Sequence, residues 1–535
     1  MVTEGKGRDP LGLARVSGLL TDMLLPGIVV NTDRARYYAA YAWMLGHIHK
    51  TEKPKTRTEF EAAFQRREAA VAYATLLADS EASTVGKNAV SARLAEGSDS
   101  LLLGMRVLPS DALGGFGQYY SGSLYKMGLS YQLEDALPRL APIGERIASA
   151  FEASISKTRF FREEHFRHKH IARSILEKDA PTLGLDGIHA KGATSEREAL
   201  IDVFFELPEG GADFGSFRPL SLCRILHLLG EYQLSGLQVG GLKDLSLDDQ
   251  LLVGPSYFGC LIGQDRRLEE YQPPAWLKRC DGLWRQFVLH ECFSWALESV
   301  LEACLEVLAA TPEGMSSEEL ARTLTSELFD EALADFHERQ VESPSALLSS
   351  LGVKELPNAQ ACATARVRLG LGSPTNEHLL LFGRSDSPQE RLAKAMSMLG
   401  TLYARWRDAS DDPHWREVRS ATGAELSAPL ALALLDTWLA PGGWREAARQ
   451  LLEMIAAHHD RVMYEKARLE ACWLRREGNR YVFEQHYEAG QHQSRHRQSL
   501  RILVDLELVT RSESGEYTLS PTGRRVLART QELRP

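Results

Sequence analysis

The sequence predicts a mainly α-helical protein, with a multi-domain helical body followed by a small α+β domain at the C-terminus. Apolar residues recur at helical spacing over most of the 535 residues. Alternation typical of β-strands is convincing only near the C-terminus. At about 150 residues per domain, the length predicts roughly three or more domains.

The first strong helix is expected after Thr32-Asp33, where Tyr38, Tyr41 and Leu45 fall on one face. Breaks in the helical pattern predict connectors at 104–128, 206–217, 370–376 and 408–413. Further helices are expected over 58–77, 140–155, 159–176, 276–309, 389–406, 424–439 and 444–473, with another starting at Ser317. The expected domains are an N-terminal helical domain over 1–130, a central body over 131–440, and a long helix plus the small domain over 441–535.

The last forty residues predict a helix, a hairpin and a second helix. The first helix, from Ser494, is amphipathic, with Leu500 and Leu503 on its apolar side. Two short apolar runs then flank a polar tip that carries Gly515, where a tight turn needs positive φ. Ser520-Pro521 opens the second helix with a cap and a proline at the first helical position. Upstream, we expect a turn at 478–479, a strand over 480–484 and a short helix or turn over 486–493.

This order resembles a winged helix, a helix-turn-helix variant of bacterial DNA-binding proteins. The resemblance implies that the N-terminal part of the helix from Ser494 reads base edges in the major groove of duplex DNA. Arginine can bond bidentately to guanine and glutamine to adenine. The candidate DNA-binding residues are Arg495, His496, Arg497, Gln498 and Arg501, with Arg511, Arg524 and Arg525 as candidate phosphate contacts.

Charge supports that interpretation only in part. Residues 473–529 hold ten Arg, no Lys and seven acidic residues, a net charge of +3 within a chain of net charge −10. Glu513 and Glu516, however, make the predicted wing acidic, which is unfavourable beside phosphates. Because winged helices also serve as protein-docking modules, docking without nucleic acid stays an alternative.

Bulk properties exclude several classes of protein. No apolar stretch reaches the roughly 18 residues that span a bilayer, and the N-terminus has no signal-peptide core, so we expect a cytoplasmic protein. The seven cysteines form no CxxC, which predicts buried, reduced thiols rather than a disulfide framework or zinc site. No familiar catalytic or nucleotide-binding motif is present, so we expect neither cofactor nor metal and hold an enzyme to be improbable.

Three other segments contain residues that are capable of chemistry. His165, His168 and His170 could approach a metal, but a solvated basic helix face is favoured. Arg285 and His290 match the R-x4-H spacing of helical ribonucleases of the HEPN type, although such a pair is expected by chance.

The loop 113–120, LGGFGQYY, could stack bases on its aromatic residues, but a loop that packs them into the body is favoured. Basic aromatic helices at 34–38 and 159–162 could together form a second polar groove.

The segments TDRARYYAAYAW and LGGFGQYYSGSL, followed by the terminal module, resemble helix-rich subunits of bacterial anti-phage defence systems. Such subunits act beside an ATPase, helicase or nuclease. The leading hypothesis is therefore a non-catalytic DNA-binding or adaptor subunit of such an assembly. A transcriptional regulator, a HEPN-like RNase effector and a protein-docking scaffold stay open as alternatives.

Overall fold

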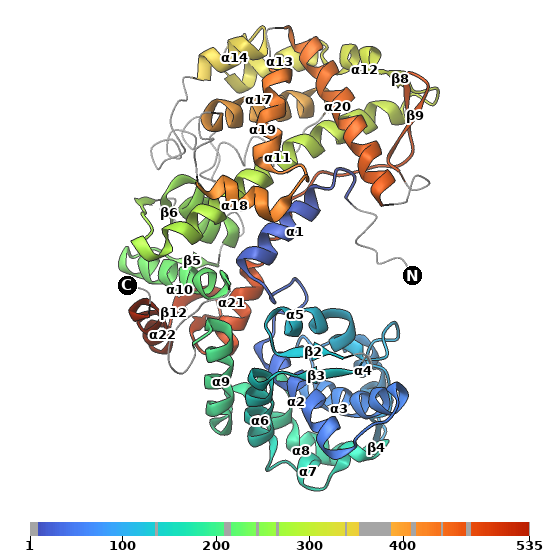
Figure 1. Cartoon of the computed structure of the whole chain (residues 1–535), viewed down its shortest axis with the longest axis vertical. Coiled ribbons are helices and arrows are strands. Elements are labelled where there is room, and N and C mark those ends of the chain that lie inside the picture. Colours follow the sequence, from blue (N-terminus) through green and yellow to red (C-terminus); the bar gives the residue numbers. More distant parts are fainter. Residues whose placement is uncertain are drawn as a thin grey trace. The chain divides into compact units, whose positions relative to one another are not determined.

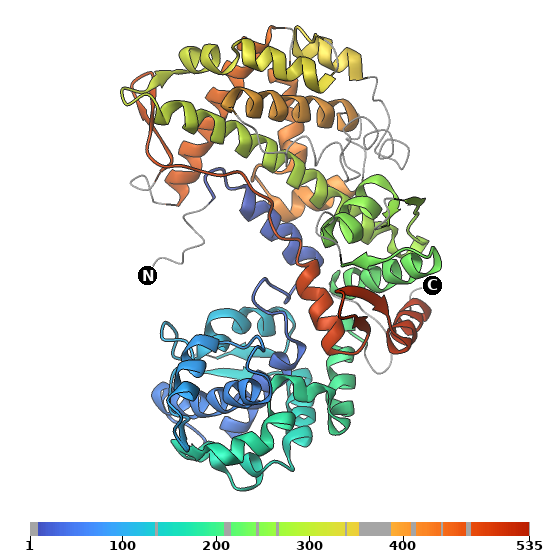
Figure 2. The same cartoon turned by 180° about the vertical axis from the view of Figure 1, so that it is seen from behind.

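The computed structural model describes residues 9–133, 137–207, 216–241, 246–263, 267–337, 340–351, 387–407, 413–439, 442–466 and 472–533. The chain is mainly α-helical, with only small sheets (Figures 1 and 2). It forms two compact units, each built from two segments: unit 1 holds Met1–Met23 and Leu237–Ser494, and unit 2 holds Leu24–Gly236 and Arg495–Pro535. The segments expected from the sequence, 1–130, 131–440 and 441–535, do not coincide with these units.

Unit 1 is built around two long helices, α11 and α17, which pack on each other and lie side by side in both views (Figures 1 and 2). Its elements are α1 (Leu13–Leu24), β5 (Val239–Gly240), the π-helix η6 (Asp249–Phe258), β6 (Cys260–Ile262), β7 (Leu268–Glu270), the 3-10 turn η7 (Ala275–Leu277), α11 (Lys278–Ala309), β8 (Met315–Ser316), α12 (Ser317–Leu324), α13 (Glu327–His337), α14 (Pro344–Leu351), α17 (Pro388–Trp406), α18 (Pro413–Thr422), α19 (Ala428–Trp438), α20 (Trp444–Glu465), β9 (Leu474–Glu477) and β10 (Arg480–Phe483).

Helix α11 forms the centre of the core of unit 1, because it is rich in apolar residues and most of its residues are buried. Helix α1 packs on it, and the Ser17 hydroxyl donates to the Glu291 carboxylate at 2.5 Å. Five of the cysteines, including Cys280, Cys292 and Cys304 on α11, are buried free thiols as expected. No helix in the described part of the chain is both long and apolar enough to cross a membrane.

Unit 2 is built around α2, which packs on α6, while α3 packs on α8 (Figure 1). Its elements are α2 (Ala35–Thr51), α3 (Arg57–Ala78), α4 (Lys87–Ala95), β1 (Ser100–Leu102), the π-helical turn η2 (Phe116–Tyr120), α5 (Ser121–Lys126), β2 (Ser130–Gln132), β3 (Pro138–Leu140), α6 (Pro142–Ile155), α7 (Arg159–Arg162), η3 (His165–Arg167), β4 (His170–Ala172), α8 (Arg173–Leu183), η4 (Leu185–His189), η5 (Lys191–Ala193), α9 (Thr194–Phe205), α10 (Arg218–Leu234), α21 (His496–Asp505), β11 (Val509–Arg511), β12 (Glu516–Leu519) and α22 (Pro521–Glu532).

The C-terminal segment of unit 2, hereafter the terminal module (495–533), has the predicted order of helix, hairpin and helix. Strands β11 and β12 pair antiparallel, with Thr510 opposite Thr518. Gly515 has φ +86°, as the predicted turn requires. The Ser520 hydroxyl accepts from the amide of Gly523, so the predicted cap of α22 is confirmed. Both β12 and α22 pack on α10 (Figure 2).

Several helix boundaries were predicted within a few residues, but the helix expected over 159–176 is wrong. Its backbone breaks at Glu164, which adopts φ +51°, and residues 170–172 then pair as β4 with β1. The helix expected over 444–473 ends at Glu465 instead. The connector expected at 370–376 lies outside the described residues, as do 408–412 of the connector expected at 408–413 and 208–215 of the connector expected at 206–217.

The segment 486–493 is extended rather than a short helix or turn, because α11 of the same unit supplies carboxylates to its amides. Ala489 donates to Glu302 at 3.0 Å, and the amide of His492 donates to Glu291 at 2.8 Å. Burial alone lowers the pKa of His492, but the charges of Glu291 and Glu298 overcome that effect and raise it to about 9.

Candidate functional site

Helix α21, the expected recognition helix, directs much of its polar surface into unit 2. Seven of its ten residues are buried, which is more than the single apolar stripe of a surface helix. Gln498 donates to the carbonyl of Val30 at 3.2 Å, and Arg495, which precedes the helix, donates to the carbonyl of Ile28 at 2.8 Å. The side chains of Arg495 and Gln498, which were expected to bond to bases, therefore bond to the backbone of the segment that leads into α2.

Asp505, at the end of α21, completes this contact. Its carboxylate accepts from the amide of Ala35 at 2.9 Å and from Arg34 Nε at 3.1 Å. Thr32-Asp33 was the expected cap of α2, yet the first residue of α2 bonds to a side chain 470 positions away. Asp33 instead pairs with Arg501 of α21. A carboxylate at a helix N-terminus is favoured both by the free amides and by the helix dipole.

The eight residues expected to bind DNA therefore separate into two sets. The first set lies against unit 2: His496 is 1% exposed, Gln498 is buried, and Arg495 and Arg501 bond to the 28–33 segment. The second set, exposed on the module, is Arg497, Arg511, Arg524 and Arg525.

Within the second set, partners are few. Arg511 lies over the ring of Tyr517, Arg525 bonds to Thr522 of its own helix, and Arg524 reaches Gln233 on α10 at 3.3 Å. Arg497 has no side-chain partner among the described residues.

The two aromatic motifs of the N-terminal third form one buried cluster. The rings of Tyr37 and Tyr41 stack with their centroids 5.1 Å apart, and the ring centroid of Tyr120 also lies 5.1 Å from that of Tyr41. Phe116 and Tyr120 are 3% and 1% exposed and Tyr119 is half-buried, so the packing interpretation of the loop is confirmed for two of its three aromatic residues. Arg36 is buried too and bonds to Glu196, which removes it from the second polar groove considered for 34–38 and 159–162.

One glycine of LGGFGQYY, Gly114, is required by the close approach of a buried carboxyl group. The Tyr41 hydroxyl and the amide of Gly115 each donate to Glu68 Oε1 at 2.9 Å. A Cβ on Gly114, whose φ is +54°, would lie 1.8 Å from Glu68 Oε2. Burial raises the pKa of Glu68 to about 8, so the carboxyl is largely protonated at neutral pH.

The ribonuclease pair does not form a site. His290 is 1% exposed, and its Nε2 lies 3.1 Å from the carbonyl of Leu13 and from Ser294 Oγ. Arg285 donates to the carbonyl of Ser256 instead of facing a phosphate. Among the described residues, no group of three His, Cys, Asp or Glu could hold a metal ion, and His165 pairs with Glu163.

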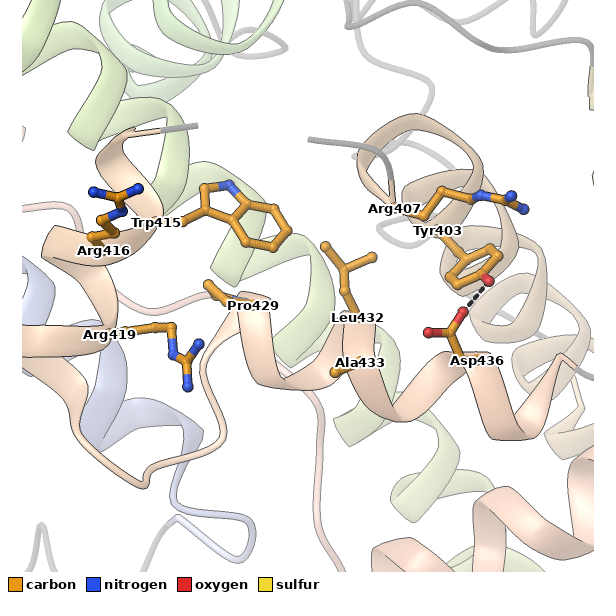
Figure 3. A pocket seen from close by; sticks show the side chains of 9 residues that line it. All are labelled: Tyr403, Arg407, Trp415, Arg416, Arg419, Pro429, Leu432, Ala433 and Asp436. Atoms are coloured by element: carbon orange, nitrogen blue, oxygen red, sulfur yellow. Dashed lines mark hydrogen bonds between the residues drawn. The ribbon is translucent and has the colours of Figure 1, made fainter. Parts of the chain in front are cut away.

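A different arginine cluster lines a pocket of unit 1, between α17, α18 and α19 (Figure 3). Its volume is about 580 Å3, within the range of small-molecule sites. Helix α18 supplies Trp415, Arg416 and Arg419 to one side, and Tyr403 and Arg407 at the end of α17 form the other (Figure 3). Between them α19 contributes the apolar residues Pro429, Leu432 and Ala433 and the carboxylate of Asp436.

Two features of this pocket distinguish it from a packing defect. Arg416 and Arg419 have no side-chain bond or ion pair with any residue of the described chain. Trp415 is only 8% exposed, yet its indole N–H has no acceptor among the described residues. A buried donor without an acceptor costs about 1–3 kcal/mol. The one carboxylate of the lining, Asp436, accepts from the Tyr403 hydroxyl.

No sequence motif marks this pocket. Trp415, Arg416 and Arg419 sit at positions i, i+1 and i+4 of a short polar helix, a pattern also typical of an exposed helix surface. Only the packing of α17 and α19 beside that helix distinguishes a pocket wall from an ordinary exposed surface. No protein-family model, curated protein or solved structure matches this chain.

Proposed function

We propose that this chain is a non-catalytic DNA-binding or adaptor subunit of a larger bacterial assembly. The observation that supports this is the exposed set of arginines on the terminal module, in a segment that contains no lysine. Guanidinium groups without carboxylate partners suit phosphate oxygens. Because α21 has most of its polar surface buried, the proposed contact is with the phosphate backbone of duplex DNA rather than with bases.

The resemblance of the N-terminal motifs to defence subunits is the sole basis for proposing a cytoplasmic anti-phage assembly with an ATPase, helicase or nuclease partner. Contact with the phosphate backbone of DNA favours this role over that of a transcriptional regulator, because a regulator must recognise one DNA sequence. A docking module without nucleic acid is the second candidate, favoured by the acidic residues Glu513 and Glu516 at the wing. It predicts co-purification with neighbours and no DNA affinity.

The test compares two triple variants for binding to labelled duplex DNA at several salt concentrations. Arg497→Ala/Arg511→Ala/Arg525→Ala removes exposed charges that bond to nothing outside the module. We expect weaker binding and a salt slope reduced by about 3, since each lost phosphate contact lowers it by about 1.

The matched control, Arg106→Ala/Arg146→Ala/Lys178→Ala, removes three exposed and unpaired charges elsewhere in unit 2 and should leave the slope nearly unchanged. Equal behaviour of the two variants would contradict the proposed surface. No binding even at low salt would favour the docking role.

A further inference from the structure

We propose that the pocket between α17, α18 and α19 binds a free nucleoside phosphate. This site lies in unit 1 and is independent of the DNA contact proposed for the terminal module. The proposal combines two observations on its wall: the unpaired guanidinium groups of Arg416 and Arg419, and facing aromatic and apolar surfaces.

Charge identifies one end of the ligand. The lining holds three arginines and one aspartate within a chain of net charge −10, so the pocket is locally cationic. Arg416 and Arg419 are three residues apart on α18 and therefore share a face of the helix. Guanidinium groups bind phosphate oxygens bidentately, and neither of these two bonds to another described residue. The structure thus points to a phosphate group at this side.

The remaining wall fits a planar organic group. The indole of Trp415 extends from α18 into the space toward α17, beside Pro429 and Leu432 of α19 (Figure 3). An aromatic wall of this kind stacks on a nucleobase, whichever base it is. The carboxylate of Asp436 would accept from a ribose hydroxyl or an exocyclic amine.

Size separates a nucleotide from simple anions. The volume of about 580 Å3 far exceeds that of inorganic phosphate, which would leave the apolar and aromatic walls uncovered. An uncharged nucleoside, in turn, would leave Arg416 and Arg419 without an anion. The arginine side of the pocket therefore suits the phosphate, and the aromatic and apolar side suits the nucleoside.

The proposal is tested by isothermal titration of the full chain with AMP, ADP and ATP, and separately with inorganic phosphate and adenosine. We expect at least one of the nucleotides to bind at least tenfold more tightly than either half. Arg416→Ala/Arg419→Ala should weaken binding by about a hundredfold, at about tenfold for each charged hydrogen-bond donor removed. Trp415→Phe keeps an aromatic ring but shortens the wall, so a smaller loss than that of the arginine double variant is expected.

Arg445→Ala is the matched control, because Arg445 is exposed and unpaired on α20 and does not line the pocket. Arg416 and Arg419 are exposed and unpaired as well, so their loss should leave the thermal unfolding midpoint unchanged. No nucleotide binding at 1 mM ligand (roughly the weakest affinity expected of a working site) would overturn the proposal. So would phosphate binding as strong as nucleotide binding, or affinity unaffected by the arginine double variant.

Discussion

Helices α21 and α18 both present arginines next to an aromatic or apolar surface, but the structure uses those arginines differently. On α21 the first turn faces the segment that leads into α2, and Arg501 is paired with Asp33. On α18 the side chains of Arg416 and Arg419 bond to no described residue, although α17 and α19 enclose the space in front of them. An arginine-rich helix can therefore hold a unit together or await a ligand, and the available acceptors decide which.

The largest effect is expected from the bond that holds α21 to α2. Asp505→Ala removes the acceptor of the first amide of α2 and the more buried of the two carboxylates that pair with Arg34, whose side chain is 12% exposed. Breaking a buried ion pair by removing one member costs about 3–5 kcal/mol, and urea denaturation would measure the loss. The control Asp33→Ala breaks the more exposed pair with Arg501 and should cost less than about 1 kcal/mol. Equal losses would mean that burial does not distinguish the two pairs.

The next effect concerns the glycine loop around Glu68. Gly114→Ala adds a methyl group against Glu68 at a positive φ, so we expect a loss of about 1–3 kcal/mol from crowding in addition to the backbone strain. Gly97→Ala is the matched control, since Gly97 has a φ of +68° with nothing within 4 Å of the added atom. The difference between the two unfolding free energies isolates the contact with Glu68. No difference would exclude that contact as the reason for the glycine.

A pH dependence of stability follows from the same carboxyl group. The folded pKa of Glu68 is raised to about 8 from an ordinary value of 4.5, so the folded chain keeps a proton that the unfolded chain releases. This contribution to stability is complete below about pH 4.5 and is lost as the pH rises through about 8. One proton corresponds to at most about 1.4 kcal/mol per pH unit. In Glu68→Gln that part of the pH dependence should vanish, and an unchanged profile would assign it to other groups.

The smallest structural effect is expected at Arg497, the residue of α21 that most resembles those of α18. Its exposed side chain has no partner in the described chain, so Arg497→Ala should change the free energy of unfolding by less than about 0.5 kcal/mol. Its contribution to DNA binding should instead appear as a salt slope lower by about 1. A large loss of stability would place Arg497 with the residues that hold α21 to unit 2.

Local sequence patterns predicted the elements better than their partners. The helices expected over 58–77 and from Ser317 are confirmed as α3 and α12, and each begins with a capping box, Thr56 with Glu59 and Ser316 with Glu319. The hairpin turn at Gly515 and the cap at Ser520 were equally local. By contrast, no local rule connects the start of α2 to Asp505, which lies 470 residues away.

The same limit applies to the sites. The sequence suggested the arginines of the terminal module, but whether a side chain such as Gln498 or Arg495 faces solvent depends on which segment packs beside it. The pocket on α18 was missed because α17, α18 and α19 each supply one wall, and none of them carries a recognisable motif. Short strands such as β1 and β4 were missed because two or three residues cannot establish alternation.

The most direct test is hydrogen exchange of the full chain, measured once with duplex DNA and once with ADP. The account predicts that DNA slows exchange in the terminal module, over 509–529, and leaves 413–439 unchanged. ADP should slow exchange in 413–439 and leave the terminal module unchanged. Protection of the same peptides by both ligands, or of neither region by its own ligand, would contradict the assignment of two separate arginine surfaces to two different phosphate ligands.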